Sequence, residues 1–550
     1  LGREESASAL PSRASTASHE SDLGSLELRL RALLSGGWWA VVCAGPQKFQ
    51  KELEACLELA REDVELSRLG SRRSSAFLER RSRATSAARP SHAYLFLEEG
   101  EEMAKKLTDC RRWLMQTFTA ADESAAEGHE AASAGREWYA EHPPVQAARR
   151  TSQDIDDSMW AMIRDPEAAR LLERSGSPGF DALAFSALPS VLGKPLQCLG
   201  YRIIKEGLLE ALSNQGIVKK ALEHKFDSCL VRFLGATDAL YSSVPYHNSA
   251  HAADVMMTME WILKSAYMRA QVSALDHLMV MVAAAIHDVG HPGRNNLFLI
   301  KTMHPLAINY NDKSVLENMH LAKSFEVMRQ ENETNWFRLL RRDHRPNDFD
   351  EGDSGHLQPG QDLQQYMRRG LIDMVLATDM ARHADHVRKL ELYAEDIREE
   401  REGEFLGELP KSSVLQRLSK HSLRQEALEN KLLLLESTLH AADLSNPSRP
   451  HPIMLQWTAR VLEEFWLQGD EERSLGLEIS PMCDREVGNK SVAKGQIGFI
   501  DFVIKPFYSP LAEIIPEMGE AVDELAKNRT FWAQMEENKV LMEDIFASLP

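Results

Sequence analysis

The stretch MVMVAAAIHDVGHPG, residues 279–293, changes from a wholly apolar helix to a polar end within a few residues. Its first half, 279–286, carries no polar side chain, yet His287 and Asp288 follow at once. Burying an imidazole and a carboxylate without partners is costly, so something must compensate them. The GHPG sequence at 290–293 indicates that the helix stops here. We interpret the pair as facing a cavity at a helix end, where it binds a divalent metal ion or, alternatively, forms a buried ion pair or caps the next element.

Two further stretches bring the same residue types to helix ends. In YHNSAHAADV, residues 246–255, His247 and His251 are four positions apart and therefore share one helix face. The stretch LHAADLSNP, residues 439–447, is another apolar helix, and it ends in Asp443 and a proline. A set of His and Asp side chains is typical of borderline or hard divalent ions and differs from thiolate-bound zinc. The pattern therefore favours a metal centre between helices.

Composition excludes several classes of function. The chain has 550 residues, enough for two or three domains, and a net charge of −19, which argues against a nucleic-acid partner. An anionic substrate would need local positive charge, which bound metal could supply. The six cysteines include no Cys-x-x-Cys pair, as expected in a reducing compartment. We expect a cytoplasmic protein; because the sequence starts at Leu1, a membrane segment further upstream is left open.

From about residue 156 onward, apolar residues recur three and four positions apart, which predicts an all-α fold. We expect residues 156–550 to form one catalytic domain, a multi-helix bundle with its site between facing helices. An exposed acidic insertion is expected at 341–362 and a charged helix or loop at 395–408. The main expected helices are 208–235, 252–267, 275–287, 314–329, 369–379, 425–443, 452–468 and 497–506.

Residues 1–155 are expected to form a separate N-terminal region of disordered segments, short helices and a linker. An amphipathic helix over 98–118 should dock on the catalytic domain or on a second copy of the chain, which makes a homodimer a candidate assembly. Arginine pairs precede Ser75 and Ser152, a pattern favoured by basophilic kinases, although a solvated basic linker would show the same composition.

The chain resembles the catalytic domain of class I cyclic nucleotide phosphodiesterases, and the cAMP-specific type most. The resemblance rests on blocks that occur in the family's order over roughly the last two thirds of the chain. Six ordered blocks are far more specific than any one of them alone. They are residues 246–255, 287–293, 310–318, 377–380, 442–447 and 495–501.

This resemblance implies a binuclear metal centre. One ion, Zn²⁺, would be held by His251, His287, Asp288 and Asp443. Asp288 would bridge to a second, harder ion, Mg²⁺ with Mn²⁺ as an alternative. Hydroxide between the two ions would attack the phosphorus of a cyclic nucleotide, while His247 protonates the departing 3′-oxygen. Glu317 would accept hydrogen bonds from water. The residues expected to orient these groups from behind are Asn248, His291 and Asp379.

The resemblance also implies a purine pocket. Gln496 and Phe499 are three positions apart on a helix, so an amide and a ring can face one space, the amide bonding the purine edge and the ring stacking on its face. Further expected lining residues are Tyr246, Asn446, Val461 and Met482. An amide can present either orientation to a purine. We expect cAMP because Asn446-Pro447 is similar to the cAMP-preferring members, with cGMP as the alternative substrate.

The chain departs from the family at two positions near the centre. Gly290 stands where many relatives have Asp, and Met319 where a His is common, which puts the second ion's preference in doubt. Two other functions remain open at this point. Another His-Asp metal phosphohydrolase acting on nucleotides would lack the Gln496 and Phe499 pair, and a non-catalytic cyclic-nucleotide-binding protein would have a decayed site.

Overall fold

Helix α14, Ala274–Ile286, is the central helix of the bundle and begins with a capping box. The Ser273 hydroxyl accepts from the Asp276 backbone N–H at 3.2 Å, and the Asp276 carboxylate accepts from the Ser273 N–H at 2.9 Å. Asp276 is fully buried and also accepts from Tyr366 Oη at 2.6 Å and from Lys431 Nζ at 3.0 Å. One carboxylate therefore ties α14 to two neighbouring helices, α18 and α20.

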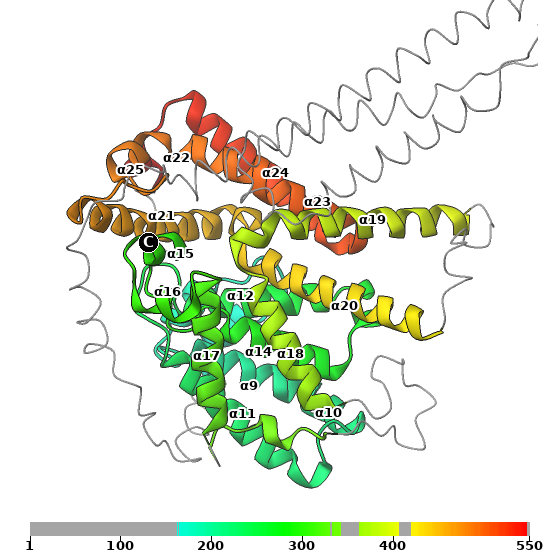
Figure 1. The fold of residues 1–550 in the computed structure, drawn as a ribbon. Helices are drawn as coiled ribbons and strands as arrows, with labels where there is room; N and C mark the ends of the chain where they lie inside the picture. The colour runs from blue at the N-terminus through cyan, green and yellow to red at the C-terminus, as the bar shows by residue number, and fades with distance from the viewer. Residues whose placement is uncertain (1–161, 163, 331–332, 343–361, 406–419, 547–550) are drawn as a thin grey trace, which may run out of the picture. The chain divides into compact units, whose positions relative to one another are not determined.

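The computed structural model describes residues 162, 164–330, 333–342, 362–405 and 420–546 (Figure 1). These residues are helical apart from turns and loops, and an isolated bridge between Val218 and Leu340 is the only β pairing among them. The all-α expectation is therefore confirmed. None of the helices in these ranges is long and apolar enough to cross a lipid bilayer.

Several expectations fall outside the described residues. They concern the whole region before residue 156, including Ser75 and Ser152, the division at residue 155, and most of the insertion at 341–362. All of them remain predictions. The charged stretch 395–408 is described as far as Phe405, where it forms the end of α19, His383–Phe405.

Apart from α14 and α19, the α-helices follow one another along the chain with short connections. They are α7 (Pro166–Leu172), α8 (Ala182–Ala187), α9 (Pro195–Ile203), α10 (Leu209–Asn214), α11 (Glu223–Asp238), α12 (Ser249–Leu263), α13 (Ala266–Gln271), α15 (Asn296–Lys301), α16 (Pro305–Tyr310), α17 (Val315–Arg329), α18 (Leu363–Leu376), α20 (Lys420–Asp443), α21 (His451–Ser474), α22 (Arg485–Phe499), α23 (Lys505–Ile514), α24 (Gly519–Glu537) and α25 (Met542–Phe546).

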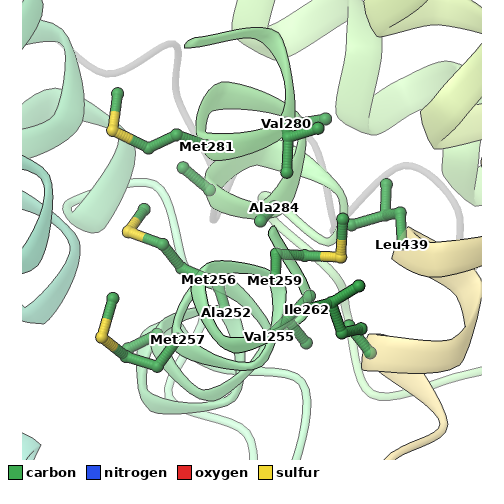
Figure 2. Packing of buried hydrophobic residues seen from close by; sticks show 14 of the residues in the cluster. Ala252, Val255, Met256, Met257, Met259, Ile262, Val280, Met281, Ala284 and Leu439 are labelled. Atoms are coloured by element: carbon green, nitrogen blue, oxygen red, sulfur yellow. The ribbon is translucent and has the colours of Figure 1, made fainter. Parts of the chain in front are cut away.

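Helices α12 and α14 pack closely because small side chains line their contact. Ala252 and Ala253 of α12 and the alanines 283–285 of α14 are all fully buried. Methionines fill the space around this contact, among them Met256 and Met259, and Leu439 of α20 completes the layer (Figure 2). Helix α20 packs against both α12 and α14. The polar ends of the three helices are therefore brought to one place.

The sequence-based helices were wrong at three boundaries. The helix expected at 208–235 is broken after α10, where Gly216 adopts a left-handed φ of 65°. The helix expected at 252–267 ends at Leu263, because Ser265 caps a new helix by accepting from Met268 N–H. Instead of one short helix at 497–506, a π-helical turn at Ile500–Ile504 joins α22 to α23.

Helix α21 lies close to the chain that leads into α22. A Cβ atom at Gly469 would overlap the backbone carbonyl of Cys483, so the two segments can meet only because this residue is glycine. Cys483 follows Met482, an expected lining residue of the purine pocket. Gly469 thus sets how near this part of the expected pocket lies to α21.

Gly469→Ala should therefore lower the thermal unfolding temperature. Overpacking of this kind costs about 1–3 kcal/mol, and backbone cannot move aside as a flexible side chain can. Gly519→Ala is the matched control, because no heavy atom lies within 4 Å of a Cβ built there and the residue is helical. Scanning calorimetry on both variants should show a decrease for the first only. Equal unfolding temperatures would contradict the close approach.

Candidate metal centre and active site

Three helix ends supply the side chains of the candidate metal centre. His251 lies in the first turn of α12, whose N-cap, Asn248, accepts from the Ala250 and His251 N–H groups at 3.0 and 3.3 Å. His287 is the C-cap of α14 and is followed by Asp288. Asp443 is the last residue of α20. Each side chain is thus fixed by the helix that ends beside it.

The four side chains face one another. His251 Nε2 lies 3.0 Å from Asp443 Oδ1 and 3.4 Å from Asp288 Oδ2. His287 Nε2 lies 3.1 Å from Asp288 Oδ2 and 3.4 Å from Asp443 Oδ1. The two imidazole Nε2 atoms are 3.4 Å apart. One ligand atom from each residue therefore falls within 4.8 Å of all the others, which is the spacing of a site for a single cation.

The chemistry of this donor set fits a divalent metal ion. His287 Nδ1 donates to the carbonyl oxygen of Ala284 at 3.0 Å, which leaves the lone pair of Nε2 directed at the cluster. Asp288 Oδ2 is buried and has no hydrogen-bond partner among the described residues. Two imidazoles and two carboxylates form a ligand set that suits Zn²⁺ and related ions.

Without a cation, protons must hold the cluster together. Burial by itself raises the pKa of Asp443, but hydrogen bonds from His251 and His287 outweigh it and hold that pKa well below its usual range. Burial by itself lowers the pKa of His287, and the charge of Asp288 outweighs it and raises the pKa. A metal ion would displace the protons from the imidazoles, so its binding weakens as the pH falls.

His247 is held by Glu464, a residue that the sequence did not identify. Glu464 lies on α21 and is buried; one oxygen accepts from the backbone N–H of Tyr246 at 2.9 Å and of His247 at 3.1 Å. Its other oxygen pairs with His247 Nδ1. Burial opposes the charge on His247, but the charge of Glu464 outweighs it and raises the pKa of His247 to about 9. His247 is thus a protonated side chain at neutral pH with its Nδ1 already engaged.

His291 and His320 form a row with His247 beside the centre. The rings of His247 and His291 stack at 3.9 Å between centroids, and those of His291 and His320 at 5.7 Å. His320 Nδ1 donates to the carbonyl oxygen of Val289 at 2.8 Å, and its Nε2 lies 3.6 Å from Asp288 Oδ1. His320 was also missed by sequence reasoning, although it directly follows the block at 310–318 and the substituted Met319.

Met319 itself points away from the centre. It is buried in a small apolar cluster with Phe298, Leu299, Leu306, Ala307, Val315 and Leu316. The departure from the family's usual His at this position therefore removes no imidazole from the cluster of metal-binding candidates.

Glu317 and Asp379 add two carboxylates near the centre. Glu317 is buried in the first turn of α17 and accepts from Asn296 Nδ2 at 3.1 Å. Asp379 accepts from Ser314 Oγ at 2.7 Å and is buried as well. Burial, together with the charge of Asp379, raises the pKa of Glu317 to about 8. A nearby cation would oppose this shift, so the pair of carboxylates is suited to a site of positive charge.

The residues expected to contact substrate lie on three elements. Tyr246 is buried beside His251, with 4.5 Å between ring centroids, and its hydroxyl accepts from Asn446 Nδ2. Val461 is half-buried on α21. Gln496 is buried and Phe499 half-buried on α22, and Met482 precedes that helix with a left-handed φ of 66°. Their roles in binding a purine remain predictions.

Comparison with known proteins agrees with this geometry. Residues 246–525 match the family described as 3′5′-cyclic nucleotide phosphodiesterase. The chain is 35% identical over 370 residues to "3′,5′-cyclic-AMP phosphodiesterase 4C" of Rattus norvegicus, covering 67% of this chain and 60% of that protein. It is 37% identical over 306 residues to "Probable 3′,5′-cyclic-AMP phosphodiesterase pde-4" of Caenorhabditis elegans, covering 56% of this chain and 40% of that protein. The chain thus spans less than two thirds of the length of these relatives.

Two solved structures resemble the fold. One is described as the structure of LmjPDEB1 in complex with IBMX, with a TM-score of 0.53 and 27% identity over 72% of this chain and all of that one. The other is the phosphodiesterase domain of the RhoPDE fusion protein from the choanoflagellate Salpingoeca rosetta, with a TM-score of 0.50 and 27% identity over 67% of this chain and 98% of that one. The matched residues 246–525 contain the whole candidate centre and make up half of the chain. The chain therefore belongs to the 3′,5′-cyclic nucleotide phosphodiesterase family.

Proposed function

We propose that this protein hydrolyses cAMP to the 5′-monophosphate at a centre of two divalent ions. The single observation that carries the proposal is the placement of a protonated His247 beside the cluster of His251, His287, Asp288 and Asp443. An acid next to a cation site is what hydrolysis of a phosphodiester needs. The names of the relatives support cAMP as the substrate, and cGMP remains the alternative.

The four clustered residues would hold one ion, for which Zn²⁺ is the best match to two imidazoles and two carboxylates. Asp288 would also contribute to a second, more weakly held ion, Mg²⁺ or Mn²⁺, on the side where Glu317 and Asp379 lie. When bound, such ions neutralise the charge of the phosphodiester and lower the pKa of water.

The chain's own residues then handle the proton. Since His247 Nδ1 faces Glu464, its Nε2 is the nitrogen that can protonate the departing 3′-oxygen. Glu464 holds the ring in this orientation and stabilises the imidazolium before the transfer. Glu317 and Asp379 are acceptors that can orient the attacking water. Gln496 and Phe499 would bind the purine by its edge and face.

Other expectations about this protein remain predictions. They are a homodimer, a kinase acting at Ser75 or Ser152, and a cytoplasmic location. The two alternative functions are weakened by the family match, and the first experiment below separates them from the proposal.

The purified chain should hydrolyse cAMP, and a chelator should abolish the activity. Restoring Zn²⁺ and Mg²⁺ together should recover it, since a scaffold with intact ligands regains its ions. A panel with cGMP and several nucleoside monophosphates, followed by chromatography of the products, measures the choice of substrate. A higher kcat/KM for cGMP than for cAMP would contradict the cAMP assignment. Hydrolysis of nucleoside monophosphates alone would favour another His-Asp phosphohydrolase, and binding without hydrolysis a non-catalytic protein.

His247→Ala should lower kcat by about 10²–10⁴-fold, the usual scale for a lost general acid. Its metal content, measured by mass spectrometry of the intact ions, should equal that of the unaltered protein because His247 is not among the four clustered ligands. Loss of metal in this variant would show that His247 is itself a ligand.

Glu464→Gln should move the alkaline limb of the pH profile of kcat to lower pH. The acid must be protonated, so activity falls as the pH rises through the pKa of His247, and Glu464 is what raises that pKa. Glu463→Gln is the matched control, because Glu463 pairs with Arg485 Nη1 at 2.8 Å on the protein surface. Overlapping alkaline limbs for the Glu464→Gln variant and the unaltered enzyme would rule out this role for Glu464.

A further inference from the structure

Gly290 lies two residues after Asp288, in a turn where its φ is 72°. The space that a side chain would occupy here is filled from α17. A Cβ atom at residue 290 would overlap Lys323 Nζ and would lie 3.1 Å from Cδ and 3.2 Å from Cε of the same side chain. The ammonium group of Lys323 therefore lies directly over the turn that carries Asp288 and His291.

Helix α17 presents three groups to this region at intervals of three residues, so they lie on successive turns of one side. Glu317 lies beside Asp379, as the rise in its pKa reflects. His320 is in contact with Val289 and lies 3.6 Å from Asp288 Oδ1. Lys323 follows one turn later. Burial chiefly lowers the pKa of His320 to about 4, and the charge of Lys323 acts in the same direction, so the field of the ammonium reaches the neighbour of Asp288.

The balance of charge at this turn is unusual for the family. Many relatives carry an Asp at the position of Gly290, so this chain lacks a carboxylate there and has an ammonium group in its place. A fixed positive charge opposes the binding of any further cation. Of the two expected ions, the one held mainly by Asp288 and water has fewer protein ligands and is the more sensitive to such a charge.

We propose that Lys323 is a specificity-determining residue that weakens the binding of the second divalent ion and thereby sets the concentration of Mg²⁺ that the enzyme requires. This inference rests on the proposed two-metal function. Lys323 acts on the ion through its charge and touches neither the substrate nor the four clustered ligands.

Titration of Mn²⁺ into zinc-loaded protein, followed by isothermal calorimetry, tests this inference without an activity assay. Lys323→Met keeps the aliphatic stem and removes the charge, and it should tighten Mn²⁺ binding by about tenfold, the scale of one charge at such range after screening. Lys323→Arg keeps the charge and should bind Mn²⁺ within about twofold of the unaltered protein. Zinc content should be equal in all three proteins.

Substitution of Gly290 supplies an independent second arm. Gly290→Asp places a carboxylate against the ammonium and should also tighten Mn²⁺ binding, whereas Gly290→Asn, of the same size and also tolerant of positive φ, should not. Equal Mn²⁺ affinity in Lys323→Met and the unaltered protein would overturn the inference and leave Lys323 as a residue that only fills space. Failure of the unaltered protein to bind any divalent ion would overturn the two-metal function as well.

Discussion

The structure depends on how four ionisable side chains can be buried where three apolar helices end. The contact between α12 and α14 is lined by alanines, so the helices come close enough for the rings of His251 and His287 to face each other, with 3.4 Å between their Nε2 atoms. Helix α20 packs on both and adds Asp443. Neither imidazoles nor carboxylates would be stable here alone. They compensate one another, and a divalent cation in their midst would compensate all four.

The charges around this centre are arranged in layers. Glu464 keeps His247 protonated, and Asp276 joins α14 to α18 and α20 from the far end of α14. Lys323 opposes this accumulation of negative charge at the turn of Gly290. The same helices thus provide both the rigid support and the electrostatic balance. Each polar group is placed by a cap or by a contact near a helix end rather than by a long loop.

Much of this could be predicted from the sequence. The end of α14 was expected within one residue, because an apolar run followed by HDVGHPG has a single reasonable helical interpretation. His251, His287, Asp288 and Asp443 were expected to converge, and the structure brings them together. The breaks at Gly216 and Ser265 were missed because apolar spacing continues across them, while backbone conformation and capping decide where a helix ends. The π-helical turn at Ile500–Ile504 has no signal in a pattern of hydrophobicity.

Glu464 was missed for a different reason. It is 217 positions from His247 in sequence and lies in the middle of a helix, where a glutamate normally faces solvent, so only the tertiary structure reveals the pair. Lys323 reads as a surface residue for the same reason. The most direct test of the central claim is anomalous X-ray diffraction at the zinc absorption edge from crystals of the purified protein. The account predicts a peak between the Nε2 atoms of His251 and His287 and the carboxylates of Asp288 and Asp443. A peak elsewhere, or zinc-soaked crystals without one, would contradict it.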